Sequence, residues 1–265
     1  MQRVIMPRHA AHRDRMLEIA VETLTADERF VAAWLGGSFG RDEQDDLSDI
    51  DLSIVVVDQF ASRLCHRSHQ VGAGTTPERL TLIRVIGEPA FVHENHSNAP
   101  SGGSFTTSVY SDTGVIFDWV LIPQSMARRP EDTKLLFDAV GIPASLPAPP
   151  LTDDERTHRL SEQVAFFWIM VVTTSKAWRR RDMVQYHQRL EMTARTSEEV
   201  ERLLDNRPWQ YIRRSRASFL TSESEQRGAI VDLCRHMMAL SPALKQAGAT
   251  IPTSPMQAVE TWLAP

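Results

Sequence analysis

The chain has 265 residues, of which 42% are hydrophobic and 24% are charged. These fractions are typical of globular proteins with a sizeable core and exclude global disorder. The net charge of −5 argues against a nucleic-acid partner, because neutralising phosphates requires clustered Lys and Arg. Cys65 and Cys234 are too few for a disulfide framework and lack metal-ligand spacing. No apolar run is long enough for a signal peptide or a membrane helix, so we expect a cytoplasmic protein without a membrane partner.

The first half of the chain alternates between helix and strand patterns. Residues 9–24 have apolar positions at helical spacing and predict an amphipathic helix. Residues 30–35 form a short apolar run that stops at a Gly-Gly pair, which is typical of a buried strand entering a turn. Residues 50–57 are rich in β-branched side chains and predict a second strand. The region 61–104 is the least legible, and within it we predict a strand at residues 80–86.

Turn residues then organise the chain up to its middle. Residues 93–104 are rich in Asn, Ser, Gly and Pro and predict a loop. The runs 105–110 and 115–122 flank Ser-Asp-Thr-Gly and predict a hairpin. The segment 141–150 contains four prolines and shows neither a helical nor a strand pattern of apolar residues. We predict that it is a linker.

Beyond this linker the patterns are helical. Thr152 and Glu155 form a capping box before a long helix. Its apolar face consists of Leu160, Val164, Phe167, Trp168 and Val171. Further helix starts are predicted at Ser222 and at Ser254. The predicted fold class is therefore α+β, with a mixed-sheet domain at 1–145 and an all-helical C-terminal domain at 151–265.

Two carboxylates in the second strand carry the strongest chemical signal. Asp49 and Asp51 are two positions apart, so on a strand both point to the same face, while the apolar residues between and after them point into a core. Two such charges about 4 Å apart repel by about 4 kcal/mol at an effective dielectric of about 20. Such a pair is stable only if it shares a proton or binds a cation, and hard oxygen ligands at this spacing suit Mg²⁺.

A glycine-containing turn precedes this pair. Gly36 and Gly37 allow the backbone to approach a phosphate closely, and Ser38 follows with a hydroxyl and an amide. Arg41 in the same turn can neutralise phosphate charge. One segment thus combines a predicted phosphate-binding turn at Gly37, Ser38 and Arg41 with a predicted metal site at Asp49 and Asp51.

The combination of Gly37-Ser38 with Asp49-x-Asp51 on a strand resembles the signature of the polymerase-beta-type nucleotidyltransferase superfamily. The chain is most similar to the lincosamide nucleotidyltransferases with a helical C-terminal domain, and more distantly to the aminoglycoside nucleotidyltransferases. Further similar stretches occur in the same order, at residues 27–30, 132–134 and 167–170. The similarity spans roughly the first 200 residues, although only the Gly-Ser to Asp-x-Asp segment is specific. Asp42 stands where many members carry glycine, and the region 61–104 does not match.

The resemblance implies a mixed sheet with helices on one face, two magnesium ions, ATP as donor and a homodimer. It also implies a third carboxylate on a neighbouring strand, and Asp118, within an apolar run, has the right setting for a metal ligand or general base. Its apolar neighbours Ile116 and Val120 should raise its pKa. Lys176, in a run of cations near the end of the long helix, is the predicted contact from the helical domain to the triphosphate.

We therefore predict an enzyme that transfers AMP from ATP to a hydroxyl of a small molecule, such as a lincosamide or aminoglycoside antibiotic or a biosynthetic metabolite, and releases pyrophosphate. Two alternatives stay open. One is a regulatory, antitoxin-like nucleotidyltransferase that modifies a protein partner, and the other is an inactive nucleotide-binding module.

Overall fold

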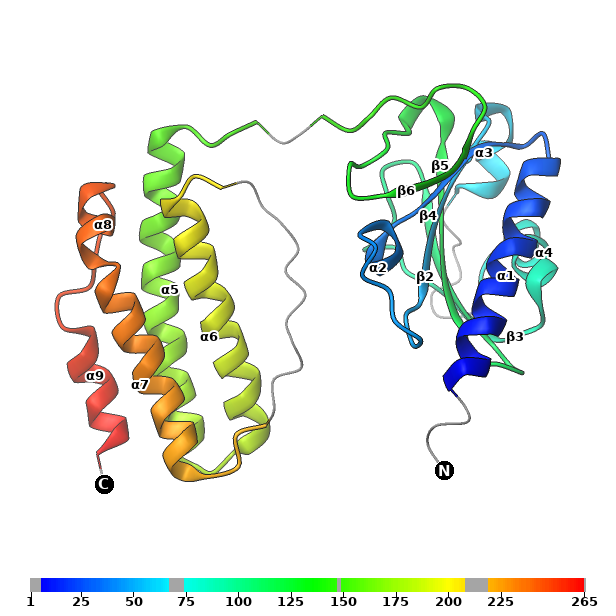
Figure 1. Cartoon of the computed structure of the whole chain (residues 1–265). Helices are drawn as coiled ribbons and strands as arrows, with labels where there is room; N and C mark the ends of the chain where they lie inside the picture. The colour runs from blue at the N-terminus through cyan, green and yellow to red at the C-terminus, as the bar shows by residue number, and fades with distance from the viewer. Residues whose placement is uncertain (1–5, 67–73, 147–148, 208–218, 265) are drawn as a thin grey trace. The chain divides into compact units, whose positions relative to one another are not determined.

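The structure is a computed structural model that describes residues 6–66, 74–146, 149–207 and 219–264. The chain divides into two compact units, residues 1–147 and 148–265 (Figure 1). The first unit is built around a mixed sheet, and the described part of the second contains helices and no strand. The α+β class is thus confirmed, and the division falls inside the proline-rich segment predicted as a linker.

The N-terminal unit is centred on a six-stranded sheet with the order β3-β4-β5-β2-β1-β6. Strands β2 and β5 pair in parallel, whereas the other neighbours pair in antiparallel orientation. The strands are β1 (Phe30–Leu35), β2 (Ile50–Val56), β3 (Pro89–Glu94), β4 (Ser104–Tyr110), β5 (Ile116–Pro123) and β6 (Lys134–Asp138). The predicted hairpin corresponds to β4 and β5, and β1 has the predicted bounds.

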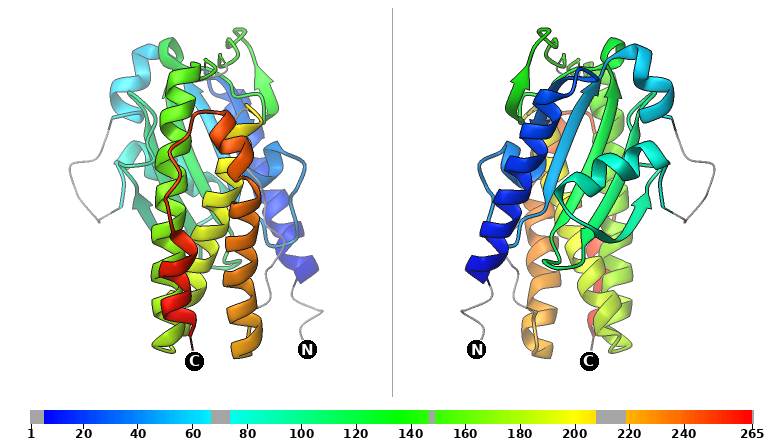
Figure 2. Two further views of the ribbon diagram at one scale, coloured as in Figure 1. Left: turned by 90° about the vertical axis from the view of Figure 1, so that its left-hand side faces the viewer. Right: turned by 90° about the vertical axis from the view of Figure 1, so that its right-hand side faces the viewer.

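Helices cover one face of this sheet, as the right-hand view of Figure 2 shows. They are α1 (Met6–Ala26), α3 (Asp58–Leu64) and α4 (Pro77–Ile83). Alternate residues of β2 and β5 point toward them, and Ile50, Leu52 and Phe117 are fully buried in this core. The predicted N-terminal helix is confirmed by α1, whose Met16, Ala20 and Leu24 pack against the same core.

The opposite face is covered only in part. At one end a small apolar cluster forms around Ala32, Trp34 and Val55 with Ile122 and Ala127. At the other end, where β2 and β5 begin, the side chains on this face are half-buried or exposed. The short helix α2 (Gly37–Gly40) follows β1 at this end. This face therefore stays accessible where the predicted site residues lie.

The strand predicted at residues 80–86 is wrong. These residues belong to α4 and to the 3₁₀ helix η1 (Arg84–Ile86). The hydroxyl of Thr76 accepts a hydrogen bond from the Arg79 amide at 3.3 Å, and Pro77 occupies the first turn, which together start a helix. Arg79 is fully buried and pairs with buried Glu94 at the end of β3. The loop predicted at 93–104 is also shorter than expected, because its first two residues, His93 and Glu94, belong to β3.

In the C-terminal unit the two longest helices, α5 and α6, pack together, and α7 and α9 pack against α5 (Figure 1). The helices are α5 (Asp153–Arg179), α6 (Met183–Leu204), α7 (Glu223–Ala239), α8 (Ser241–Gln246) and α9 (Pro255–Leu263). Both predicted capping boxes form, at Thr152 with Glu155 and at Ser222 with Glu225. The aromatic side chains of Phe167 and Trp168 are buried in the core of this unit. No helix in the described part of the chain is both long and apolar enough to cross a membrane.

Candidate active site

Asp51 and Asp118 are direct neighbours in the parallel pair of β2 and β5. Neighbouring strands lie about 4.8 Å apart, and paired residues point to the same face. Asp49 immediately precedes β2, two positions before Asp51. The residues between and after the two aspartates, Ile50 and Leu52, are fully buried on the helix-covered face. The fold thus places three carboxylates together on the accessible face.

The row of paired residues extends beyond Asp118. Thr107 on β4 pairs with Asp118, and His93 on β3 pairs with Thr107. The Thr107 hydroxyl donates a hydrogen bond to Asp118 Oδ1 at 2.5 Å. His93 is exposed at the outer end of the row. Thr107 therefore fixes one oxygen of the Asp118 carboxylate and leaves the other for a different partner.

The turn after β1 packs directly against Asp51. The Gly36 amide donates to the Asp51 carbonyl at 2.9 Å. Gly37 has a φ of +55°, and a Cβ built on it would lie 1.8 Å from Asp51 Oδ2. The Asp51 carboxylate thus occupies the space that any other side chain at position 37 would need. The predicted phosphate-binding turn and the predicted metal site are therefore in contact.

The pKa values of all three carboxyl groups are raised, and burial is the largest cause in each case. The pKa of Asp51 is raised first by burial and then by the charges of Asp118 and Asp49, while Arg41 lowers it. The pKa of Asp49 is raised by burial and by Asp118, and His9 opposes this shift. Burial also raises the pKa of Asp118, although the Thr107 hydrogen bond opposes it. The expected direction for Asp118 is confirmed.

Ser38 and Arg41 lie in and directly after α2. Ser38 is half-buried, and its hydroxyl has no hydrogen-bond partner in the described part of the chain. The amides of Gly37, Ser38 and Phe39 open the helical turn, where backbone N–H groups have no preceding turn to bond to. Arg41 pairs with Glu43 at 3.0 Å and also acts on Asp51 through its charge. These groups are donors beside the carboxylates, as an anionic substrate requires.

Lys176 belongs to α5 in the other unit. Its Nζ lies 5.1 Å from the centre of the Trp262 ring, and it lines a pocket between α5 and α6. These contacts all lie within the helical unit, and the predicted role of Lys176 at the triphosphate stays a prediction.

The donor atoms of the three carboxylates determine which metal ion they could hold. Within the described ranges, no three His, Cys, Asp or Glu side chains are grouped so that they could hold a metal ion. Asp49, Asp51 and Asp118 nevertheless offer only oxygen donors, which suit Mg²⁺. Their charges raise one another's pKa, and none of them forms an ion pair within the described part of the chain. The donor chemistry of these three residues therefore fits Mg²⁺.

Two residues near the carboxylates were missed by the sequence reasoning. Thr107 lies on β4, far from Asp118 in sequence, and only strand pairing brings the two together. The half-buried positions Phe105, Thr107 and Val109 alternate with buried ones, which was the available signal that Thr107 faces the site. His9 lies near the start of α1, donates from Nδ1 to the Asp46 carbonyl at 3.1 Å and lowers the pKa of Asp49 through its charge. No sequence signal linked His9 to the site.

Comparison with known proteins adds no family: no family model matches the chain, and no curated protein sequence matches it. The nucleotidyltransferase assignment therefore depends on the sequence motif and on the arrangement of the site residues.

Proposed function

We propose that this protein is a magnesium-dependent nucleotidyltransferase of the polymerase-beta type, which transfers AMP from ATP to a hydroxyl of a small molecule. The observation that carries the proposal is the pairing of Asp51 with Asp118, with Asp49 beside them and the Gly36–Ser38 turn against Asp51. The carboxylates can bind cations, and the backbone amides of the turn beside them can bind phosphate oxygens. The site therefore suits a substrate such as a nucleoside triphosphate with its metal ions.

In the proposed reaction the chain's own groups position the donor and activate the acceptor. The amides of Gly37 and Ser38, the Ser38 hydroxyl and Arg41 bind the phosphate oxygens of ATP. Asp118 accepts the proton of the acceptor hydroxyl, whose oxygen attacks the α-phosphorus in line with the leaving pyrophosphate. Thr107 holds Asp118 Oδ1, so that the free oxygen faces the acceptor.

Asp49 and Asp51 are the residues that would hold magnesium, with Asp118 as a further ligand. When bound, the ion supplies charge neutralisation and Lewis-acid polarisation of the phosphate oxygens.

The accessible face of the sheet indicates the character of the acceptor. On β3, β4 and β5 the side chains around Asp118 on this face are Phe91, His93, Phe105, Thr107, Val109, Ile116 and Val120. Phe91 is 60% exposed, and none of these side chains is a carboxylate. A polycationic acceptor requires several carboxylates, whereas an apolar surface suits an uncharged ring or alkyl chain. The proposal therefore favours an acceptor of the lincosamide kind over an aminoglycoside.

The substitution Asp118→Asn tests the assignment of the base. We expect turnover to fall by about 100-fold or more, with the Kd for ATP within a few-fold of the parent. If Asp118 serves mainly as a metal ligand, affinity for ATP with Mg²⁺ should fall together with the rate. Asp112→Asn, in the exposed hairpin turn, is the matched control and should change neither quantity. A fully active Asp118→Asn protein would remove this residue from the mechanism.

Mass spectrometry identifies the acceptor. The protein is incubated with ATP and Mg²⁺ against a panel of lincosamides, aminoglycosides and hydroxylated metabolites, and we expect an added AMP on an acceptor with an apolar body. Addition of AMP to a protein in place of every small molecule would favour the regulatory alternative. ATP binding without transfer to either class would favour an inactive binding module.

A further inference from the structure

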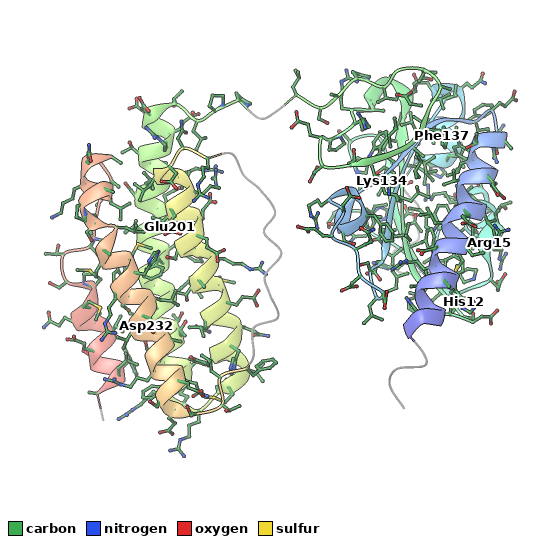
Figure 3. The ribbon with its side chains drawn as sticks, in the orientation of Figure 1. His12, Arg15, Lys134, Phe137, Glu201 and Asp232 are labelled. Carbon is green, nitrogen blue, oxygen red and sulfur yellow. The ribbon has the colours of Figure 1, made fainter. Side chains whose placement is uncertain are left out.

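Most arginines of the helical unit are engaged by carboxylates or by backbone carbonyls. Figure 3 labels two carboxylates of this unit that pair with basic side chains, Glu201 on α6 and Asp232 on α7. Glu201 pairs with His236 at 2.9 Å, and Asp232 pairs with Arg235 at 3.2 Å. Other ion pairs are Arg156–Asp153, Arg181–Glu223, Arg195–Glu191, Arg202–Glu199 and Arg207–Asp205. Positive charge on this unit is therefore mostly neutralised by the protein itself.

Lys176, Arg180 and Arg189 are exceptions, and they line one pocket of 160 Å³ where α5 ends and α6 begins. Within the described residues none of the three has a carboxylate partner. Lys176 lies over the Trp262 ring, and Arg189 donates to the neutral Gln185 side chain at 2.8 Å. We call this group the basic pocket.

The basic pocket has an excess of positive charge. Asp182 is the only acidic residue that lines it. Its carboxylate accepts a hydrogen bond from the Gln185 amide at 3.1 Å and so caps the start of α6. Three cations against one engaged carboxylate leave a net charge of about +2, and like charges repel at this range. The positive end of the α6 dipole adds to the excess.

Capping of α5 does not explain these cations. The carbonyls in the last turn of α5 are already bonded, since Lys176 O accepts from the Arg180 amide and Ala177 O accepts from the Asp182 amide, each at 3.1 Å. The neighbouring cations behave differently, because Arg179 donates to the Ala264 carbonyl and Arg181 pairs with Glu223. Among the described cations between Lys176 and Arg189, those that face the pocket are the ones without such acceptors, which indicates an external anion.

The volume defines the size of that anion. At 160 Å³ the basic pocket is smaller than the roughly 300–1,000 Å³ of sites that enclose drug-sized ligands. It suits a compact oxyanion and not a whole nucleotide. Planar guanidinium groups with a lysine ammonium are the donors that bind the oxygens of a phosphate group.

We infer that the basic pocket of Lys176, Arg180 and Arg189 binds a phosphate group. The inference uses none of the carboxylates of the candidate active site and is independent of the proposed transferase activity. The phosphate group can come from free phosphate or pyrophosphate, or from the end of a nucleoside triphosphate, and the experiment separates these sources.

Titration calorimetry on the full chain, in EDTA and at low ionic strength, tests the inference with inorganic phosphate, pyrophosphate, ATP and adenosine as probes. We expect binding of at least one phosphate probe and none of adenosine. Arg189→Gln should weaken it by about tenfold, as loss of a charge-assisted hydrogen bond predicts. Arg195→Gln removes the same charge from the same helix outside the pocket and should stay within twofold of the parent. Arg189→Lys, which keeps the charge, should recover part of the affinity.

Several results would overturn the inference. One is the absence of phosphate, pyrophosphate and ATP binding at millimolar concentration. Another is an equal loss in Arg189→Gln and Arg195→Gln, which would show diffuse charge attraction. A third is loss of binding in Ser38→Ala together with normal binding in Arg189→Gln, which would place the anion at the Gly36–Ser38 turn. Lys176→Gln repeats the test if Arg189→Gln does not fold. A protein that binds pyrophosphate in the basic pocket but transfers no AMP would refute only the proposed function.

Discussion

Replacing Gly37 with alanine should separate the geometry of the site from the stability of the fold. A Cβ at this position would lie 1.8 Å from Asp51 Oδ2, whereas ordinary contacts begin at 3.4 Å. The carboxylate must therefore withdraw by about 1.6 Å, the difference between these distances. Because a misplacement of about 1 Å can cost about 100-fold in rate, we expect Gly37→Ala to lose at least about 100-fold in turnover. The left-handed backbone, with a φ of +55°, adds a stability cost of about 1–2 kcal/mol.

Gly141→Ala is the matched control. Gly141 has a φ of +74° and nothing within 4 Å of a built Cβ, so it carries the same backbone strain without the contact. Both variants should lose about 1–2 kcal/mol in urea unfolding, and only Gly37→Ala should lose AMP transfer and affinity for ATP with Mg²⁺. If both variants have equal turnover per folded molecule, the position of Asp51 does not matter for the reaction and the reasoning fails.

Three further substitutions test the carboxylates and their surroundings. The pKa of Asp51 is raised by burial and by the charges of Asp118 and Asp49. The folded state therefore binds a proton at Asp51 more tightly than the unfolded state does. As a result, the free energy of unfolding falls as pH rises from about 4 through the folded pKa. Asp51→Asn in EDTA should therefore be more stable than the parent at pH 7 and equal to it below about pH 4; urea unfolding at both pH values checks this, and a less stable variant at pH 7 would contradict it. Asp42 has a φ of +55°, so Asp42→Gly should raise the free energy of unfolding by about 1 kcal/mol, and a loss of stability would show that its side chain is needed in the turn. Thr107→Val removes the hydrogen bond to Asp118 and should slow turnover by about tenfold with an unchanged Kd for ATP, while Thr107→Ser should keep the rate; equal rates in all three proteins would leave the hydrogen bond without a role.

Local sequence patterns predicted most of the secondary structure. Alternation in β2, with Ile50 and Leu52 buried and Asp51 on the other face, follows from the two-residue period of a strand. The capping boxes at Thr152 and Ser222 are also local, because the side chain and the amides it bonds are within three positions. The resemblance to nucleotidyltransferases is also local, because it depends on the short segment from Gly37-Ser38 to Asp49-x-Asp51.

Strand β6 and helix α4 were not predicted because their state depends on distant partners. The β6 segment Lys134–Asp138 has no fully buried side chain and so shows no core-facing alternation, yet it forms an edge strand by pairing with β1. Apolar residues at 80–86 suit a strand as well as a helix. Burial of Arg79 against Glu94 and the carbonyl of Leu64 fixes the helix in place, and no local pattern contains this contact.

Local sequence was enough to place Asp49 and Asp51 on one face of a strand and to put Gly37, in the predicted phosphate-binding turn, a short distance before them. The residues that lie beside them in space come from distant parts of the chain and depend on how the strands pair. Asp118 comes beside Asp51 through the parallel register of β2 and β5, and Thr107 reaches Asp118 from β4. Register is set by how the buried face of each strand packs against the helices, which is a property of the whole core and not of any one segment.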